Sequence, residues 1–170
     1  MLIRKEEAKD YESIYSVVKN AFDNAEYSDG NEQDLVNALR EGTAFIPELS
    51  LVAEVDGKIV GHIIFTKATV DNSEILVLAP LSVLPRYRRK GIGTALIQEG
   101  HKIAKKLGYK YAVVLGSEQY YSRIGYIPAD LYGINPPFDV PRENFMAYRI
   151  NETAPDIYGI VKYAKEFGID

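Results

Sequence analysis

The chain has 170 residues, of which 46% are hydrophobic and 26% charged, and its formal net charge is −4. This length and composition are those of an ordinary globular domain with a full hydrophobic core, so we expect a single domain over residues 1–170. The negative net charge argues against a general nucleic-acid binder, and the absence of cysteine excludes disulfide scaffolds, thiolate metal sites and cysteine nucleophiles.

The first forty residues predict one strand followed by two helices. Residues 2–8 are expected to form a short strand, and residues 10–22 a helix capped by Asp10. The apolar positions at helical spacing in that helix are Ile14, Val17, Val18 and Ala21. Residues 24–30 are a polar break. A second helix is predicted from Asn31 to Gly42, and its apolar face consists of Leu35, Val36 and Leu39.

The middle of the chain predicts the centre of a sheet. Residues 49–70 have the pattern of a hairpin, and the Asp56-Gly57 pair at its tip suits a type I′ turn. Residues 74–84 predict a strand that is apolar at nearly every position and therefore buried on both faces. A helix over residues 93–108 and a buried strand over residues 111–116 follow. The expected apolar face of that helix is Ala95, Leu96, Ile103 and Leu107.

The last third of the chain is less regular. Residues 117–125 predict a brief helix, and residues 127–170 form an irregular C-terminal extension. This extension contains a proline-rich loop at 127–144, a last strand at 145–150 and a helix over residues 157–167. The order of elements predicts one α/β (α+β) domain with a mixed sheet.

Three further absences limit the function. The N-terminal residues are charged from the start and lack the apolar core of a signal peptide, and no apolar run reaches membrane-spanning length. We therefore expect a cytoplasmic protein that does not bind membranes. The two histidines, His62 and His101, are not spaced with acidic residues as in a metal site, so we expect no metal.

A basic, glycine-containing stretch, RYRRKGIGTA at residues 86–95, joins the central strand to the following helix. The helix N-terminus offers unpaired N–H groups, and Gly91 and Gly93 let a ligand approach the backbone, so we interpret the stretch as a phosphate site. Side chains that add bonds to phosphate oxygens are Arg88, Arg89, Lys90 and Thr94. A P-loop pattern is absent, and Leu96 replaces the third glycine of a dinucleotide fingerprint. A solvated basic turn is the alternative interpretation.

The residues from Arg88 to Gly93 match the pattern [QR]-x-x-G-x-[GA], and the stretch resembles the acetyl-CoA pyrophosphate loop of the GNAT superfamily of N-acetyltransferases. The segment YYSRIGYIPA is similar to the terminal signature of that superfamily, with Tyr121 four residues before Gly125. Other segments within residues 1–150 are similar to the branch of YhbS-like predicted acetyltransferases. One departure is Val114, where many members carry an asparagine near the cofactor. The resemblance implies a mixed, mostly antiparallel central sheet flanked by helices.

The resemblance also implies a reaction, the transfer of an acetyl group from acetyl-CoA to a small-molecule or peptide amine within a ternary complex. In that reading the backbone N–H of Val83 polarises the thioester carbonyl. Tyr121 is the implied general acid for the departing thiolate, with Tyr120 as the alternative and simple helix packing as the structural explanation. The implied cofactor-binding residues are Leu81, Ser82, Val83, Arg88, Arg89, Lys90, Gly91, Ile92, Gly93 and Thr94.

A general base is harder to identify. An alkylamine with a pKa of about 10.4 must lose a proton before it attacks, either to a side chain or through water. The candidates on the central strands are Glu54, His62 and Glu74. A satisfied strand histidine and solvated carboxylates at strand ends explain the same residues without catalysis.

The nature of the acceptor and the functional class each remain open between alternatives. The segment 22–34 forms the acceptor side in the superfamily and is acidic, which favours a cationic amine, whereas a solvated loop explains it equally well. Its acidic residues are Asp23, Glu26, Asp29, Glu32 and Asp34. The alternatives from other classes are a non-catalytic acyl-CoA sensor of the same fold and a nucleic-acid binder that uses the arginine cluster. The sequence leaves the oligomeric state open, a homodimer included.

Overall fold

The structure is a computed structural model that describes residues 1–23, 25–26 and 28–169. Asn24 and Tyr27 of the predicted polar break lie outside the described residues. The helices are α1 (Tyr11–Phe22), α2 (Glu32–Glu41), α3 (Ile92–Lys106) and α4 (Glu118–Ser122). The strands are β1 (Leu2–Lys5), β2 (Ser50–Val55), β3 (Lys58–Val70), β4 (Ser73–Val83), β5 (Tyr111–Leu115), β6 (Ile127–Pro128), β7 (Ile134–Asn135), β8 (Phe145–Arg149) and β9 (Gly159–Lys162).

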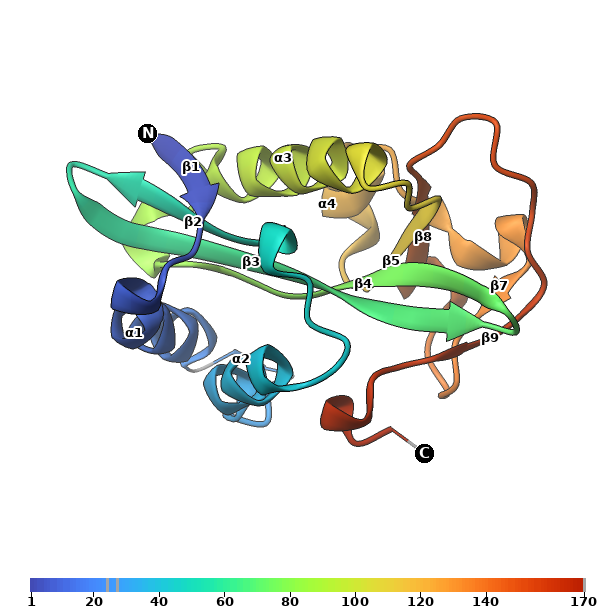
Figure 1. Cartoon of the computed structure of the whole chain (residues 1–170), viewed down its shortest axis with the longest axis horizontal. Helices are drawn as coiled ribbons and strands as arrows, with labels where there is room; N and C mark the ends of the chain where they lie inside the picture. Colours follow the sequence, from blue (N-terminus) through green and yellow to red (C-terminus); the bar gives the residue numbers. More distant parts are fainter. Residues whose placement is uncertain (24, 27, 170) are drawn as a thin grey trace.

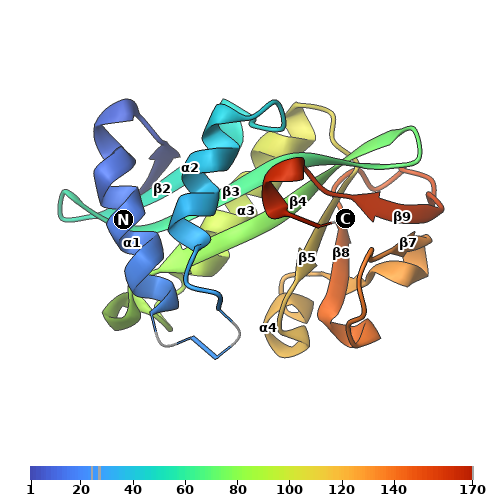
Figure 2. The ribbon, with the colours of Figure 1, turned by 90° about the horizontal axis from the view of Figure 1, so that it is seen from below.

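A twisted sheet separates two helical layers (Figure 1). Helices α3 and α4 cover one face, and α1 and α2 cover the other. The C-terminal segment after β9 returns to the α1–α2 face, where Phe167 packs against the same apolar cluster as these two helices. Figure 2 shows this segment beside α2, seen from below the sheet.

The sheet order is β1-β2-β3-β4-β5-β8-β6, and along this path only the β4–β5 pair is parallel. β9 pairs with the far end of β3, at Thr69 and Val70, and also with β7. The predicted mixed sheet, mostly antiparallel and flanked by helices, is therefore confirmed.

Most of the predicted core is also confirmed, since it follows the periodicity of each element. The four predicted positions of α1 are buried. β4 is buried on both faces through its centre, where Ile75 to Leu78 are each at most 2% exposed. The hairpin tip has positive φ at Asp56 (50°) and Gly57 (77°), as a type I′ turn requires.

The predicted face of α3 is partly wrong. Leu107 is 43% exposed, and the buried face instead includes Ile97, Gly100 and Ala104. The reason is a close approach of α3 to the sheet, because a Cβ on Gly100 would lie 2.2 Å from the ring of Phe65. The orientation of α3 is therefore set by Gly100, which lets the helix approach the sheet closely. A prediction from the spacing of apolar residues does not take a glycine into account.

The predicted N-cap of α1 is also corrected. The Asp10 carboxylate makes no capping bond to α1 and instead accepts the backbone N–H of Glu7 at 2.8 Å. Its other partner is the guanidinium of Arg4, at 2.7 Å and 3.0 Å. The strand predicted over residues 2–8 accordingly ends at Lys5 and gives way to a short turn.

The helix predicted over residues 157–167 is wrong. The segment contains β9 and a single 3-10 turn, Lys165–Phe167. Gly159 has a φ of 151°, which a helix does not allow, and the strand gains backbone partners from β3 and β7. Tertiary pairing has overridden the helical spacing of the apolar residues.

Candidate active site

The gap between β4 and β5 is the central feature of the site. The two strands pair over only two positions, Leu76 with Ala112 and Val77 with Val113. Just beyond them the pairing of β4 with β3 shifts register, between Ile63 and Phe65. A bulge of this kind bends a strand and re-aims its backbone. The C-terminal half of β4 therefore runs on without β5 beside it.

The backbone groups that face this gap follow from the hydrogen-bond pattern. The Leu84 N–H donates to the Val60 carbonyl at 2.9 Å. Amide directions alternate along an antiparallel strand, so Ser82 also faces β3, while Leu81 and Val83 face the gap. The Ser82 side chain is buried as well. The backbone groups of Leu81 and Val83 thus face the gap, whereas the backbone groups of Ser82 face β3 and its side chain is buried.

The loop before α3 has the backbone geometry of an anion site. Gly91 precedes the helix with a φ of 82°, which costs glycine little, and no side chain caps the helix. The first helical bond runs from the Ala95 N–H to the Gly91 carbonyl, so the N–H groups before Ala95 have no helical partner. A Cβ on Gly93 would lie 2.8 Å from the Tyr120 hydroxyl. Glycine keeps this part of the turn open.

A cavity of about 660 Å³, which we call the loop cavity, lies against this turn. It is bordered by the end of α1, by β4 and by the N-terminus of α3. Most of the predicted cofactor residues line it, namely Leu81, Val83, Arg88, Arg89, Gly91, Ile92, Gly93 and Thr94. Lys90 is not among the lining residues, and its ammonium lies 5.5 Å from the centre of the Tyr87 ring.

Arg88 has a role that the motif did not predict. Its guanidinium donates to the carbonyl of Ala21, near the end of α1, at 2.5 Å. A cation at a helix C-terminus is favourable because the dipole there is negative. Arg88 therefore ties the end of α1 to the basic loop.

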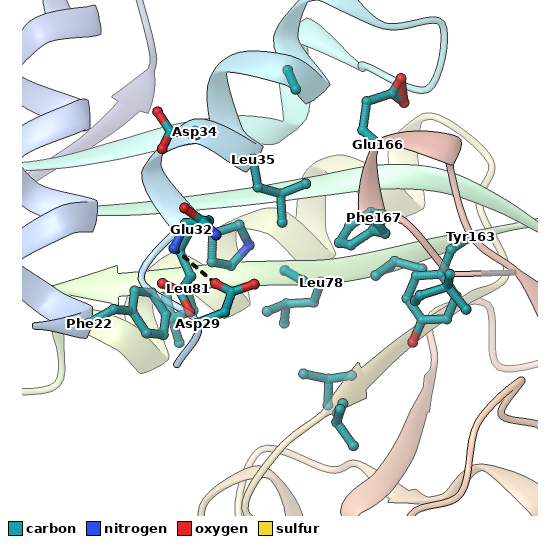
Figure 3. Close-up of a pocket in the computed structure, with 18 of the residues that line it drawn as sticks. Phe22, Asp29, Glu32, Asp34, Leu35, Leu78, Leu81, Tyr163, Glu166 and Phe167 are labelled. Carbon is teal, nitrogen blue, oxygen red and sulfur yellow. Dashed lines mark hydrogen bonds between the residues drawn. The ribbon is translucent and has the colours of Figure 1, made fainter. Parts of the chain in front are cut away.

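A second cavity, of about 860 Å³, lies on the α2 side of the gap and is called the acidic cavity below. Phe22, Leu81 and Tyr120 line both cavities, so the two adjoin at these residues. Figure 3 shows Asp29 and Glu32 on one side of Leu78 and Glu166 and Phe167 on the other. The site thus consists of two adjoining cavities, one against the glycine loop and one with carboxylates on its walls.

The two adjacent tyrosines of α4 differ in their surroundings. The Tyr120 hydroxyl lies 3.2 Å from the Thr94 hydroxyl at the junction of the cavities. Tyr121 lines the acidic cavity and is 8% exposed, and its hydroxyl has no hydrogen-bond partner within the described residues. Burial raises the pKa of Tyr121 above its ordinary value, so the phenol stays protonated at neutral and mildly alkaline pH.

The structure brings none of the three expected bases to either cavity. Glu54 pairs with Arg4 at 3.2 Å on a different surface, between α1 and the β2–β3 hairpin. Glu74 lies near Tyr109, whose pKa is raised by burial and by that carboxylate. His62 is 0% exposed, beneath α1 and α2.

His62 belongs to a buried polar network. Its Nε2 lies 3.0 Å from the Ser50 hydroxyl and 3.2 Å from the Glu6 carboxylate. Arg40 donates to the same carboxylate at 2.7 Å and 3.1 Å. Burial opposes the charge of Glu6, but bonds from His62, Arg40 and Ser50 outweigh it and lower its pKa to about 2. Burial lowers the pKa of His62, which is therefore neutral at pH 7.

Three of the predicted acidic residues do line the acidic cavity, namely Asp29, Glu32 and Asp34. The sequence pattern does not indicate the C-terminal part of the wall, which consists of Tyr163, Glu166, Phe167 and Ile169, nor Phe138 of the proline-rich loop. One sequence feature could have indicated this wall. Gly159 interrupts the apolar run of the C-terminal segment, and such a glycine is typical of the end of a strand rather than of a helix.

The described part of the chain lacks two further features. No group of three or more His, Asp or Glu side chains there is arranged to hold a metal ion. None of the helices found there combines the length and apolarity needed to cross a membrane.

The chain is similar in sequence to several N-acetyltransferases. The acetyltransferase (GNAT) family matches residues 10–126. The chain is 41% identical over 118 residues to the uncharacterized N-acetyltransferase YjhQ of Escherichia coli strain K12, covering 66% of this chain and 65% of YjhQ, just under two thirds of that relative. It is 31% identical over 171 residues to the uncharacterized N-acetyltransferase YhbS of the same strain, covering 98% of both.

Two solved structures have the same fold over nearly the whole chain. The crystal structure of Escherichia coli YhbS in complex with CoA has a TM-score of 0.88 and 28% identity, and covers 98% of this chain and 91% of that one. A GNAT family acetyltransferase from Brucella melitensis in complex with acetyl-CoA has a TM-score of 0.81 and 34% identity, covering 98% and 97%.

Proposed function

The chain belongs to the acetyltransferase (GNAT) family, and on that premise we propose that it transfers an acetyl group from acetyl-CoA directly to an amine, both bound at once. The observation that carries this proposal is the meeting of two cavities at the β4–β5 gap. One cavity has the features of an anion site and the other has acidic walls. Two ligands of opposite charge can therefore approach the same stretch of β4.

The loop cavity fits the pyrophosphate of coenzyme A. Unpaired N–H groups and the positive end of α3 favour an anion, and a Cβ at Gly93 would intrude on the space. Arg89 adds a cation at the cavity wall. When bound, acetyl-CoA supplies the acetyl group as an activated thioester. In this proposal Leu81 and Val83 bind the arm of the cofactor through backbone groups that have no strand partner.

The polar groups at the gap have two tasks. The N–H of Val83 donates to the carbonyl oxygen as negative charge develops on it, which is the role of an oxyanion hole. The hydroxyl of Tyr121 donates to the sulfur that leaves. A thiol has a pKa of about 8.5, below the ordinary value of about 10 for tyrosine. Burial raises the pKa of Tyr121 further. Full proton transfer from Tyr121 is therefore uphill, and its main contribution is a hydrogen bond.

The acceptor must lose a proton before it attacks. An alkylammonium with a pKa of about 10.4 is neutral only about once in 2,500 at pH 7, a cost of over 4 kcal/mol. The lining of the acidic cavity contains carboxylates but no histidine within the described residues. We propose that water carries the proton away and that no single side chain is essential for this step. Glu54, His62 and Glu74 then have structural roles.

Ligand-induced stabilisation tests the cofactor assignment. At about 100 times its Kd, a ligand stabilises the protein by about 2.7 kcal/mol, roughly 5–11 °C in Tm for a chain of this length. We expect this shift with acetyl-CoA and CoA and not with ATP or NADH. Gly93→Val should abolish the shift while the unliganded Tm changes by only a few degrees. An unchanged shift in that variant would reject the loop assignment.

Release of free thiol from acetyl-CoA in the presence of amines tests the transfer. A specific shift with acetyl-CoA but no thiol release with any amine would instead identify a non-catalytic acyl-CoA sensor. Tyr121 facing the chamber beside an intact loop favours turnover.

A further inference from the structure

We propose that the acceptor is a primary amine carried on an apolar alkyl or aryl body that bears no carboxylate. This inference rests on the proposed function and specifies the substrate class for the acidic cavity. It follows from four properties of the cavity. These are the single sign of the charge on its walls, its apolar floor, the position of Glu166 at the C-terminal end of α2, and the hydroxyl of Tyr121, which has no hydrogen-bond partner within the described residues.

The charge on the walls has one sign. Asp29, Glu32, Asp34 and Glu166 line the cavity, and no lysine, arginine or histidine lines it within the part of the chain that the structure describes. Among the described residues, the first three carboxylates accept hydrogen bonds only from neutral groups: the Asn31 N–H (2.9 Å), the Ser28 hydroxyl (2.7 Å) and the Tyr15 hydroxyl (3.2 Å). No cation of that part of the chain neutralises their charge. A cleft lined by one sign of charge concentrates the opposite ion.

Helix α2 explains part of this cluster but not all of it. Glu32 and Asp34 lie in the first turn of α2, where the helix dipole favours negative charge. Glu166 lies at the opposite end, where a Cβ on Gly42, the C-terminal cap, would be 2.9 Å from the Glu166 carboxylate. The dipole disfavours a carboxylate there. A cationic ligand in the cavity gives this carboxylate a favourable partner, which it lacks among the residues that the structure describes.

The floor and the remaining walls of the cavity are apolar. β4 contributes Leu78, Pro80 and Leu81, and β5 contributes Val114 and Leu115. Further apolar side chains come from α1, α2 and the C-terminal segment, namely Phe22, Leu35, Phe167 and Ile169. An acceptor whose body carries uncharged polar groups or a carboxylate would lose hydration against these surfaces without new hydrogen bonds. An alkyl or aryl body instead gains from its burial.

Tyr121 ties the cavity to a ligand independently of the carboxylates. Its side chain is more than nine-tenths buried and lines the acidic cavity, and its hydroxyl has no partner within the described residues. The hydroxyl oxygen itself is not fully enclosed, so it is open to a hydrogen bond from a ligand in the chamber. In the proposed transfer the reacting amine must reach the thioester at the gap, so the amine end of the acceptor points toward the gap beside Tyr121, and its body lies along the floor.

A matched set of amines tests the proposal. Hexylamine, propylamine and 6-aminohexanoate are compared by kcat/KM at saturating acetyl-CoA. Each fully buried methylene is worth about fourfold, so hexylamine should exceed propylamine by about tenfold to fiftyfold. It should exceed 6-aminohexanoate, which has the same length and a carboxylate at the far end, by at least tenfold. Calorimetric binding of hexylamine and 6-aminohexanoate to the protein saturated with CoA should give the same order without turnover.

Charge variants test which carboxylates act. Glu32→Gln and Glu166→Gln should each raise the KM for hexylamine about threefold to tenfold and leave the KM for acetyl-CoA unchanged. Glu41→Gln is the matched control, because Glu41 is exposed on the same helix and does not line the cavity. An equal effect of Glu41→Gln would overturn the assignment.

The outcomes separate the substrate class from the reaction itself. Equal turnover of propylamine and hexylamine, or of 6-aminohexanoate and hexylamine, would overturn the substrate class while leaving acetyl transfer intact. Binding of acetyl-CoA without acetylation of any of the three amines would overturn both. Acetylation of hexylamine in the expected order supports both.

Discussion

A pair of tyrosine variants distinguishes a catalytic hydroxyl from a structural one. Tyr121 and Tyr126 are both buried and their rings pack edge to face, with centroids 5.5 Å apart. The Tyr126 hydroxyl lies 2.8 Å from Nε2 of His101, whereas the Tyr121 hydroxyl has no partner among the described residues. Replacing either tyrosine by phenylalanine removes one hydroxyl group, and the two rings concerned pack against each other.

The expected effects are opposite. Tyr126→Phe leaves the buried nitrogen of His101 without its partner, which costs about 2 kcal/mol, or roughly 4–8 °C in Tm at this chain length. Its kcat should stay within about twofold of the parent. Tyr121→Phe breaks no hydrogen bond within the described residues, so its Tm should change by less than about 2 °C. Its kcat should fall about 10- to 100-fold, because the leaving sulfur loses a donor.

The assays are thermal unfolding and thiol release at saturating acetyl-CoA and amine. Burial raises the pKa of Tyr121 above its ordinary value, which adds a pH test, since the phenol stays protonated between pH 7 and 9. The ratio of parent to Tyr121→Phe rates should therefore be constant between pH 7 and 9. A kcat of Tyr121→Phe within twofold of the parent would refute the hydrogen-bond role. A Tm loss as large as that of Tyr126→Phe would show that the hydroxyl is structural.

Three other predictions concern stability, pH and the basic loop. Arg40→Met should lower the free energy of unfolding by about 3–5 kcal/mol, because it leaves the buried Glu6 carboxylate without its cationic partner; a loss below 1 kcal/mol in urea unfolding would contradict this. Burial lowers the pKa of His101 to about 4, so below about pH 6.5 the unfolded chain takes up a proton that the folded one does not. Stability should therefore fall as the pH drops, by about 2 kcal/mol between pH 7 and 5 from this group, and His101→Gln should show a correspondingly flatter profile. Arg88→Gln should lower the free energy of unfolding by about 1 kcal/mol, because the bond to the Ala21 carbonyl is lost. Arg89→Gln should instead weaken acetyl-CoA binding and reduce the salt dependence of that binding. If Arg88→Gln weakened binding and Arg89→Gln lowered stability, the roles given to these two arginines would be wrong.

The parts of the site that are local in sequence could be predicted, and the parts that depend on long-range pairing could not. The loop from Arg88 to Gly93 contains its own glycines and cations, so the sequence alone predicts a phosphate-type loop before a helix. The gap at Leu81 and Val83 depends on a bulge against β3, and only the family resemblance indicated it.

The acidic cavity shows the limit more clearly. Its α2 wall follows from a contiguous acidic segment, and three of those residues line it. Glu166 and Phe167 reach the same cavity only because β9 pairs with Thr69 and Val70 of β3, nearly a hundred residues earlier. Helical spacing in residues 157–167 predicted the wrong element. Secondary-structure periodicity carries no information on which strand a C-terminal segment will join.

The position of Ile169 in the wall of the acidic cavity has a practical consequence for biochemistry on this protein. A bulky group such as an affinity tag, attached directly after Ile169, would lie at the rim of the chamber and would obstruct amines during a screen. The N-terminus lies across the sheet from that segment, and Met1 is 67% exposed (Figure 1). Purification through an N-terminal tag would leave the chamber accessible, and a paired comparison of the two tagged forms would measure the obstruction directly.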